Sequence, residues 1–132
     1  MKIRNIVYSL FLSAFFLQAF SQKKTVSRAE KEYDRFAYVD AIDNYEKVAE
    51  KGYQDEKMFQ KLGNAYYFKA ELPQALKWYD QLFAVYPNQE PEYFYRYSQA
   101  LKSTGDYVKA DQILEQFNQK TGNDQRGILF KE

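Results

Sequence analysis

Acidic side chains at helical spacing are the first residues in this chain that could do chemistry. Asp40, Asp43, Glu46 and Glu50 recur every three or four positions, so one helix would carry them close together. Paired carboxylates can serve as general acid and base, and they can also bind a cation. A solvated outer helix face explains the same spacing without any ligand. A hydrolase that uses carboxylates alone therefore stays a third hypothesis, behind two that need no catalysis.

The side chains that are absent exclude more chemistry than the acids suggest. The chain has no cysteine and no histidine, so it has no thiol nucleophile, no Ser-His-Asp set and no disulfide. Zinc sites built by proteins rely on these same two residue types. We therefore predict that the protein is not an enzyme and holds neither metal nor cofactor. With 19 basic and 18 acidic side chains, it also lacks the positive charge that nucleic-acid binding requires.

Aromatic residues are unusually frequent, with 13 Tyr and 11 Phe in 132 residues. Tyr93, Phe94, Tyr95 and Tyr97 stand together and could stack against sugars or bases. A helix whose positions alternate between core and surface accounts for them without a ligand. We favour this structural interpretation, because repeated helices use large aromatic side chains to fill the space between them.

The sequence contains an internal repeat, which determines where the acidic and aromatic residues lie in the fold. Small side chains recur at steps of 34 and 35 residues, and so do two series of larger ones. The small residues are Ala29, Gly63 and Ser98, and Ala41, Ala75 and Ala110; the larger ones are Tyr38, Leu72 and Tyr107, and Tyr45, Tyr79 and Leu114. A period of about 34 residues is the signature of the tetratricopeptide repeat. The sequence thus predicts an all-α superhelix of about three helix-turn-helix repeats, a fold that usually binds partners.

The period divides the chain into repeats over residues 22–55, 56–89 and 91–123, followed by 124–132 as a C-terminal tail or the start of a missing segment. The six small residues are expected where the two helices of a repeat cross and a larger side chain would force them apart. Pro73 is expected in the first turn of a helix, where its missing N–H costs nothing. Asp106 is expected to cap the helix that follows it.

The N-terminus has a different composition. Lys2 and Arg4 precede a long apolar run, and the small residues Ala19 and Ser21 follow at the spacing of a cleavage site. This pattern predicts a signal peptide over residues 1–21. An uncleaved membrane anchor is the rival interpretation, but the apolar run is shorter than the roughly 20 residues that cross a bilayer. We expect an exported protein, located in the periplasm or on the periplasmic face of the outer membrane, which contacts a membrane only before cleavage.

Five segments carry a family resemblance: residues 38–42, 61–67, 77–79, 93–99 and 105–111. They are similar to the N-terminal tetratricopeptide region of OmpA-family outer-membrane proteins from the Bacteroidota. In that family a propeller-like segment and a peptidoglycan-binding domain follow, and neither is present in these 132 residues. The resemblance implies an alternative function, in which the chain is the N-terminal fragment of a protein that binds peptidoglycan through missing downstream sequence.

The first helix of each tetratricopeptide repeat lines the concave surface of the superhelix. The residues predicted there, as a partner-binding groove, are Lys57, Gln60, Lys61, Asn64, Tyr67, Phe68, Tyr95, Arg96, Gln99 and Lys102. Aromatic rings interleaved with amides suit an extended peptide, because amides pair with its backbone while rings cover its side chains. The alternative is that Tyr67 and Phe68 pack within the array and the polar residues are merely solvated.

Binding of the terminal carboxylate of a peptide is disfavoured, because Glu30 and Glu92 fall on the same predicted surface and would repel it. The leading hypothesis is thus a non-catalytic protein-protein interaction module of the cell envelope. Its partner would be an envelope protein or an extended peptide.

Overall fold

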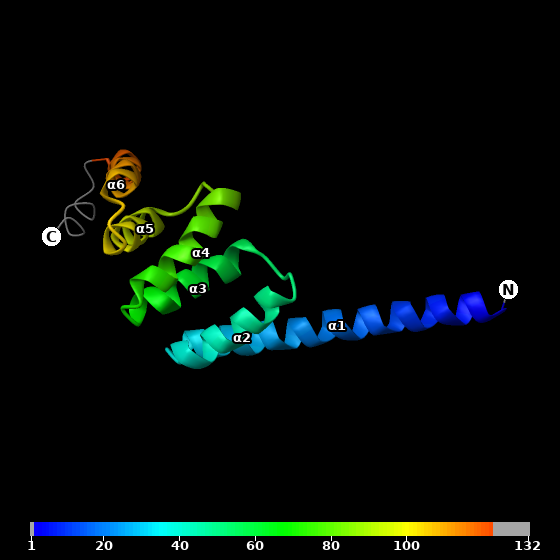
Figure 1. Cartoon of the computed structure of the whole chain (residues 1–132). Coiled ribbons are helices and arrows are strands. Elements are labelled where there is room, and N and C mark those ends of the chain that lie inside the picture. The colour runs from blue at the N-terminus through cyan, green and yellow to red at the C-terminus, as the bar shows by residue number, and fades with distance from the viewer. Residues whose placement is uncertain (1, 123–132) are drawn as a thin grey trace. The chain divides into compact units, whose positions relative to one another are not determined.

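A computed structural model describes residues 2–122, so the predicted tail over 124–132 lies outside the described residues. Residues 2–122 contain helices and no strand, and the predicted all-α tetratricopeptide-type fold is confirmed. The six helices are α1 (Lys2–Asp34), α2 (Tyr38–Glu50), α3 (Glu56–Phe68), α4 (Leu72–Val85), α5 (Pro91–Ser103) and α6 (Tyr107–Thr121) (Figure 1). They form two compact units, Met1–Tyr53 and Gln54–Glu132, which we call unit 1 and unit 2.

Unit 1 is the hairpin of α1 and α2. Ala29 and Ala41 are fully buried in it, as expected for small residues where two helices cross. Tyr45 and Val48 on α2 are each 1% exposed and complete this core. The C-terminal half of α1 is thereby held in place, although few of its residues are apolar.

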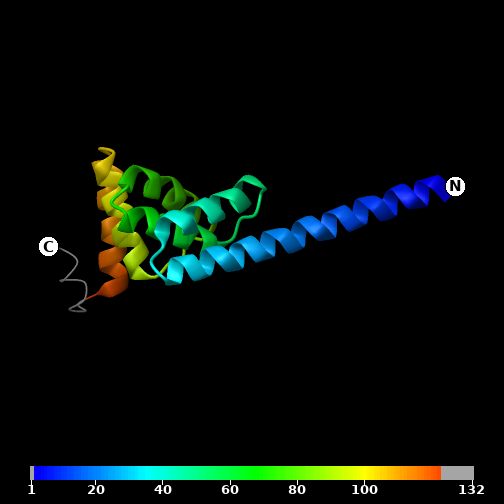
Figure 2. The ribbon, with the colours of Figure 1, turned by 90° about the horizontal axis from the view of Figure 1, so that it is seen from below.

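The N-terminal half of α1 has a different environment. It extends beyond α2 with no other helix of unit 1 beside it (Figures 1 and 2). Ile3 and Phe15 are 79% and 76% exposed. The helix continues without a break through Ser21, where cleavage was expected, and the predicted signal peptide stays a prediction. Among residues 2–122, no helix combines the length and the hydropathy that crossing a bilayer requires.

Unit 2 consists of two helical hairpins, α3 with α4 and α5 with α6, and α4 packs against α5. Gly63 and Tyr79 show why the first hairpin can close. A Cβ atom added to Gly63 would lie 2.5 Å from Cε1 of Tyr79, which is closer than carbon atoms can approach. The absence of a side chain at Gly63 therefore makes the room that the Tyr79 ring occupies.

Local sequence signals determine where the helices of unit 2 begin. The side chain of Asp55 accepts a hydrogen bond from the backbone N–H of Met58, and Asp106 accepts one from Lys109, which confirms the predicted cap. Pro73 lies in the first turn of α4, as expected.

One residue in the turn inside each of the three helical hairpins adopts a left-handed backbone. These residues are Phe36, Ala70 and Gly105, with φ of 61°, 59° and 86°, and they recur at the period of the repeat. In each turn the next residue donates its N–H to the carbonyl five residues earlier: Ala37 to Glu32, Glu71 to Tyr66 and Asp106 to Leu101. This is the Schellman geometry, which favours glycine. Only the third of these turns has glycine at the left-handed position, Gly105.

A candidate partner-binding site on α3 and α5

A half-buried arginine is the centre of the candidate site in unit 2. The guanidinium carbon of Arg96 on α5 lies 5.1 Å from the ring centroid of Phe68, 5.8 Å from that of Tyr93 and 5.9 Å from that of Tyr67. Phe68 and Tyr67 belong to α3, so the cation joins two helices that are not consecutive. Each ring within about 6 Å attracts the cation through its quadrupole. We call these four residues the Arg96 cluster.

Asn64 fixes the inner side of the Arg96 cluster. Its side chain is 5% exposed, and its Oδ1 accepts hydrogen bonds from Arg96 Nη1 at 3.0 Å and from the Tyr79 hydroxyl at 2.8 Å. Its Nδ2 donates to the Tyr93 hydroxyl at 3.5 Å. A buried amide must have partners, and here they orient the guanidinium. Asn64 is thus a support for the site, and it is less accessible to a partner than predicted.

Gln60 also has an internal role. Its Nε2 donates to Oε1 of Gln89 at 2.7 Å, and Nε2 of Gln89 donates to Glu56 Oε1 at 2.7 Å and to the carbonyl of Tyr86 at 2.8 Å. Gln89 lies in the connection between α4 and α5 and is 4% exposed. The bonds to Gln60 and Glu56 tie that connection to α3. Sequence reasoning missed Gln89, because a polar residue in a loop between helices gives no signal of burial.

The other predicted groove residues differ in their surroundings. Phe68 is 46% exposed and is the most accessible ring of the cluster. The ring of Tyr95 lies 6.1 Å from that of Phe117 on α6, so part of it packs within the unit. Lys57 is exposed, whereas Lys61, Gln99 and Lys102 are partly buried. The structure therefore brings Tyr67, Phe68 and Arg96 together.

Burial and charge both act on the tyrosines of the cluster. Burial, together with the nearby Tyr95, raises the pKa of Tyr67, and the positive charge of Arg96 offsets part of this. Burial also raises the pKa of Tyr93, against the lowering effects of its hydrogen bond with Asn64 and of Arg96. Both hydroxyls thus stay protonated and can donate hydrogen bonds at neutral pH.

The residues predicted to pack the repeats are buried, namely Ala29, Ala41, Gly63, Ala75, Ser98 and Ala110. In the aromatic segment of α5, Phe94 and Tyr97 are 1% and 2% exposed, whereas Tyr93 and Tyr95 are only partly buried. Core and surface positions therefore alternate along this helix, as the structural interpretation of the aromatic run requires.

A second polar cluster in unit 2 was not foreseen. The Tyr97 hydroxyl donates to Oδ1 of Asp80 at 2.5 Å, and Nζ of Lys109 lies 3.1 Å from the same oxygen. Burial and the bond to Asp80 raise the pKa of Tyr97 to about 12. The three residues line an open cavity of about 520 Å³ together with Phe83, Ala84, Pro87, Ile113 and Gln116. These residues come from three helices and a loop, so no local motif indicates the cluster.

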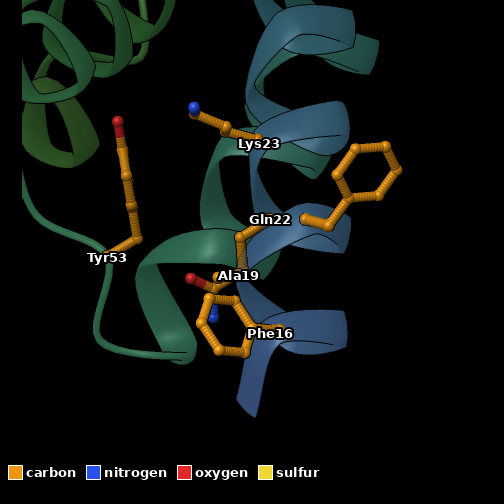
Figure 3. Close-up of a pocket in the computed structure, with 6 residues that line it drawn as sticks. Phe16, Ala19, Gln22, Lys23 and Tyr53 are labelled. Atoms are coloured by element: carbon orange, nitrogen blue, oxygen red, sulfur yellow. The ribbon is translucent and has the colours of Figure 1, made fainter. Parts of the chain in front are cut away.

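Unit 1 holds another open cavity, of about 360 Å³ (Figure 3). Phe16, Ala19, Phe20, Gln22 and Lys23 line it from α1, and Tyr53 lines it from the segment after α2. Its lining is mostly apolar. The cavity follows from the exposed apolar half of α1 and has no features of a catalytic site.

The four acidic residues at helical spacing lie on α2. Asp40, Asp43 and Glu50 are exposed and Glu46 is partly buried. Within residues 2–122, no group of three or more acidic side chains is placed to hold a metal ion. The acids thus resemble the solvated helix face expected as the simpler interpretation.

Comparison with solved structures supports the fold. The chain is similar to PcrH, solved in complex with the chaperone binding region of PopB, with a TM-score of 0.62 and 15% identity over 83% of this chain and 88% of that one. It is also similar to SycD, a type III secretion translocator chaperone of Yersinia enterocolitica, with a TM-score of 0.61 and 16% identity over 86% of this chain and 87% of that one. No family model matches the chain. No curated protein matches it either.

These comparisons correct one prediction and leave another without support. SycD is a type III secretion translocator chaperone, and both similar structures point away from export to the periplasm. The expected location in the periplasm or at the outer membrane is therefore wrong. It was inferred from the apolar N-terminus, but an apolar helix can equally pack against another protein. No comparison supports the resemblance to OmpA-family proteins, which rested on short segments that any tetratricopeptide array can share.

Proposed function

We propose that the face shared by α3 and α5 in unit 2 binds an extended segment of another protein and carries out no reaction. The Arg96 cluster is the observation on which this rests. It combines an accessible ring, Phe68, with a guanidinium held in place by Asn64. Interface hot spots are enriched in aromatic residues and arginine, in surroundings that limit water.

Two further observations favour a protein segment as the ligand. The first is that PcrH, which shares the fold, was solved with the chaperone binding region of PopB. The second is that helix faces of this kind bind peptides through rings that cover side chains and polar groups that fix their register. Neither observation identifies the partner of this chain.

Selection of short random peptides displayed on phage tests the proposal with the full chain as bait. We expect peptides that bind the unmodified chain and bind Phe68→Ala at least tenfold more weakly, since truncating a hot-spot ring costs about 1–4 kcal/mol. The matched control is Tyr107→Ala on α6, which removes a ring that is 62% exposed and lies outside the cluster.

Circular dichroism on both variants checks that the helices remain intact. Selected peptides that bind Phe68→Ala and the unmodified chain equally well would place the binding surface elsewhere and overturn the proposal.

A further inference from the structure

Arg96 has no carboxylate partner among the described residues. Its polar contact is the neutral oxygen of Asn64, and the groups around it are three rings. Glu92 stands one turn earlier on α5, yet the ion pairs of residues 2–122 do not join it to Arg96. A charge removed from water without a counterion is costly. The rings offset this cost only in part.

The way Arg96 is held suits one particular ligand. A guanidinium has five N–H donors in a planar fork, and Asn64 takes one bond, from Nη1. The rings restrict the orientation of the fork before any ligand arrives. A carboxylate matches such a fork with two parallel hydrogen bonds, which are stronger than bonds between neutral groups.

Resting on the proposed function, we propose that Arg96 binds the carboxylate of an aspartate or glutamate side chain within the extended partner segment. Phe68, next to the guanidinium and 46% exposed, covers an apolar residue beside that acid. The partner segment thus carries an acidic residue adjacent to an apolar one. The ligand is an internal side chain and not a chain terminus. Glu92, one turn from Arg96, is exposed, so water and salt screen its repulsion, whereas the guanidinium fork bonds the carboxylate directly.

Peptide display tests this with two baits, the full unmodified chain and the full-length variant Arg96→Glu. Random peptides are followed by a constant segment, so that their own C-termini are blocked. Peptides selected on the unmodified chain are expected to be enriched in Asp or Glu at one position beside an apolar residue. Those selected on Arg96→Glu are expected to carry Lys or Arg at that position.

Binding constants then test the pairing directly. Replacing the selected acid by its amide, Glu→Gln or Asp→Asn, is expected to weaken binding to the unmodified chain about tenfold or more, because hydrogen bonds between charged groups are the strong ones. The same replacement should leave binding to Arg96→Gln almost unchanged. Lys77→Glu is the control for charge, since Lys77 lies over Trp78 on α4, away from the cluster.

The outcomes separate this inference from the proposed function. If peptides depend on Phe68 but show no acidic preference, or the same preference with Arg96→Glu, the acidic specificity is overturned and the binding face stands. If no selected peptide depends on Phe68, both fail. Arg96→Lys keeps the charge without the fork and should retain part of the acidic preference. It serves as the test variant if the variants that remove the charge fold poorly.

Discussion

The hydroxyl of Tyr79 on α4 donates a 2.8 Å hydrogen bond to Oδ1 of Asn64 on α3, inside the first hairpin of unit 2. The same oxygen accepts from Arg96 on α5. The core of one repeat is therefore connected through a single amide to the surface proposed for binding, and perturbation of the core should reach the Arg96 cluster.

Removal of that hydroxyl is the first prediction. Tyr79→Phe should lower the free energy of unfolding by about 1–2 kcal/mol, because it removes a buried hydrogen bond without changing the ring. Urea denaturation followed by circular dichroism measures this. Tyr107→Phe removes an exposed hydroxyl and should change little. Equal stability of the two variants would show that the Tyr79 bond contributes nothing.

A second prediction concerns Gly63. Gly63→Ala should destabilise the chain by about 1–2 kcal/mol, because the cost of a clash with the Tyr79 ring exceeds the gain in helix propensity. Tyr79→Leu removes the ring, and in that background the same substitution should become neutral or stabilising. Denaturant unfolding of the two single variants and the double variant measures the coupling. Additive effects would contradict the close contact.

The turn residues give a third prediction. Ala70→Gly should stabilise the chain by about 0.5–1 kcal/mol, because it relieves a left-handed backbone that alanine rarely adopts, at some cost in entropy. Gly105→Ala places alanine in the equivalent conformation of the third turn and should destabilise by a similar amount. Thermal denaturation of both variants checks the opposite signs. The same sign for both would show that the turns rearrange.

A fourth prediction is a dependence of stability on alkaline pH. Tyr97 has a pKa of about 12 in the folded chain, against about 10 for an unperturbed tyrosine. Its neutral form is favoured by folding, so the stabilisation is complete below pH 10 and is lost as the pH rises from about 10 to 12. The free energy of unfolding, measured across this pH range, should fall less steeply with pH for Tyr97→Phe than for the unmodified chain.

Lys109 acts in the same direction, because its hydrogen bonds to Tyr97 and Asp80 raise its pKa. Other tyrosines and lysines titrate in this range, so the difference between variants is the quantity to measure. Tyr107→Phe is the control and should keep the full slope. Parallel slopes for all three proteins would exclude a special role for Tyr97.

Periodicity in the sequence was sufficient to predict the fold. Small residues such as Gly63 and Ala75 mark helix crossings because packing tolerates little else there. Helix starts at Pro73 and Asp106 follow from local chemistry, and both agree with the structure. The left-handed turn conformations were not predicted, because Phe36 and Ala70 lack the glycine that would indicate them.

The site was predicted less completely than the fold. Of the residues predicted to bind a partner, Tyr67, Phe68 and Arg96 lie together in the structure, and their role in binding stays a prediction. Periodicity places a residue on a face, but it does not show which polar groups bond to each other. Asn64 and Gln60 were therefore predicted to contact a partner, although their amides form hydrogen bonds within unit 2.

Gln89 has a consequence for the thermodynamics of binding. Its amide ties the connection between α4 and α5 to α3 through two bonds of 2.7 Å, to Gln60 and Glu56. The spacing between α3 and α5 is thus preorganised before a ligand arrives. A protein whose site is already ordered loses little conformational entropy on association, and most of that loss falls on the peptide. Among candidate partners, those already extended in the free state should therefore compete best.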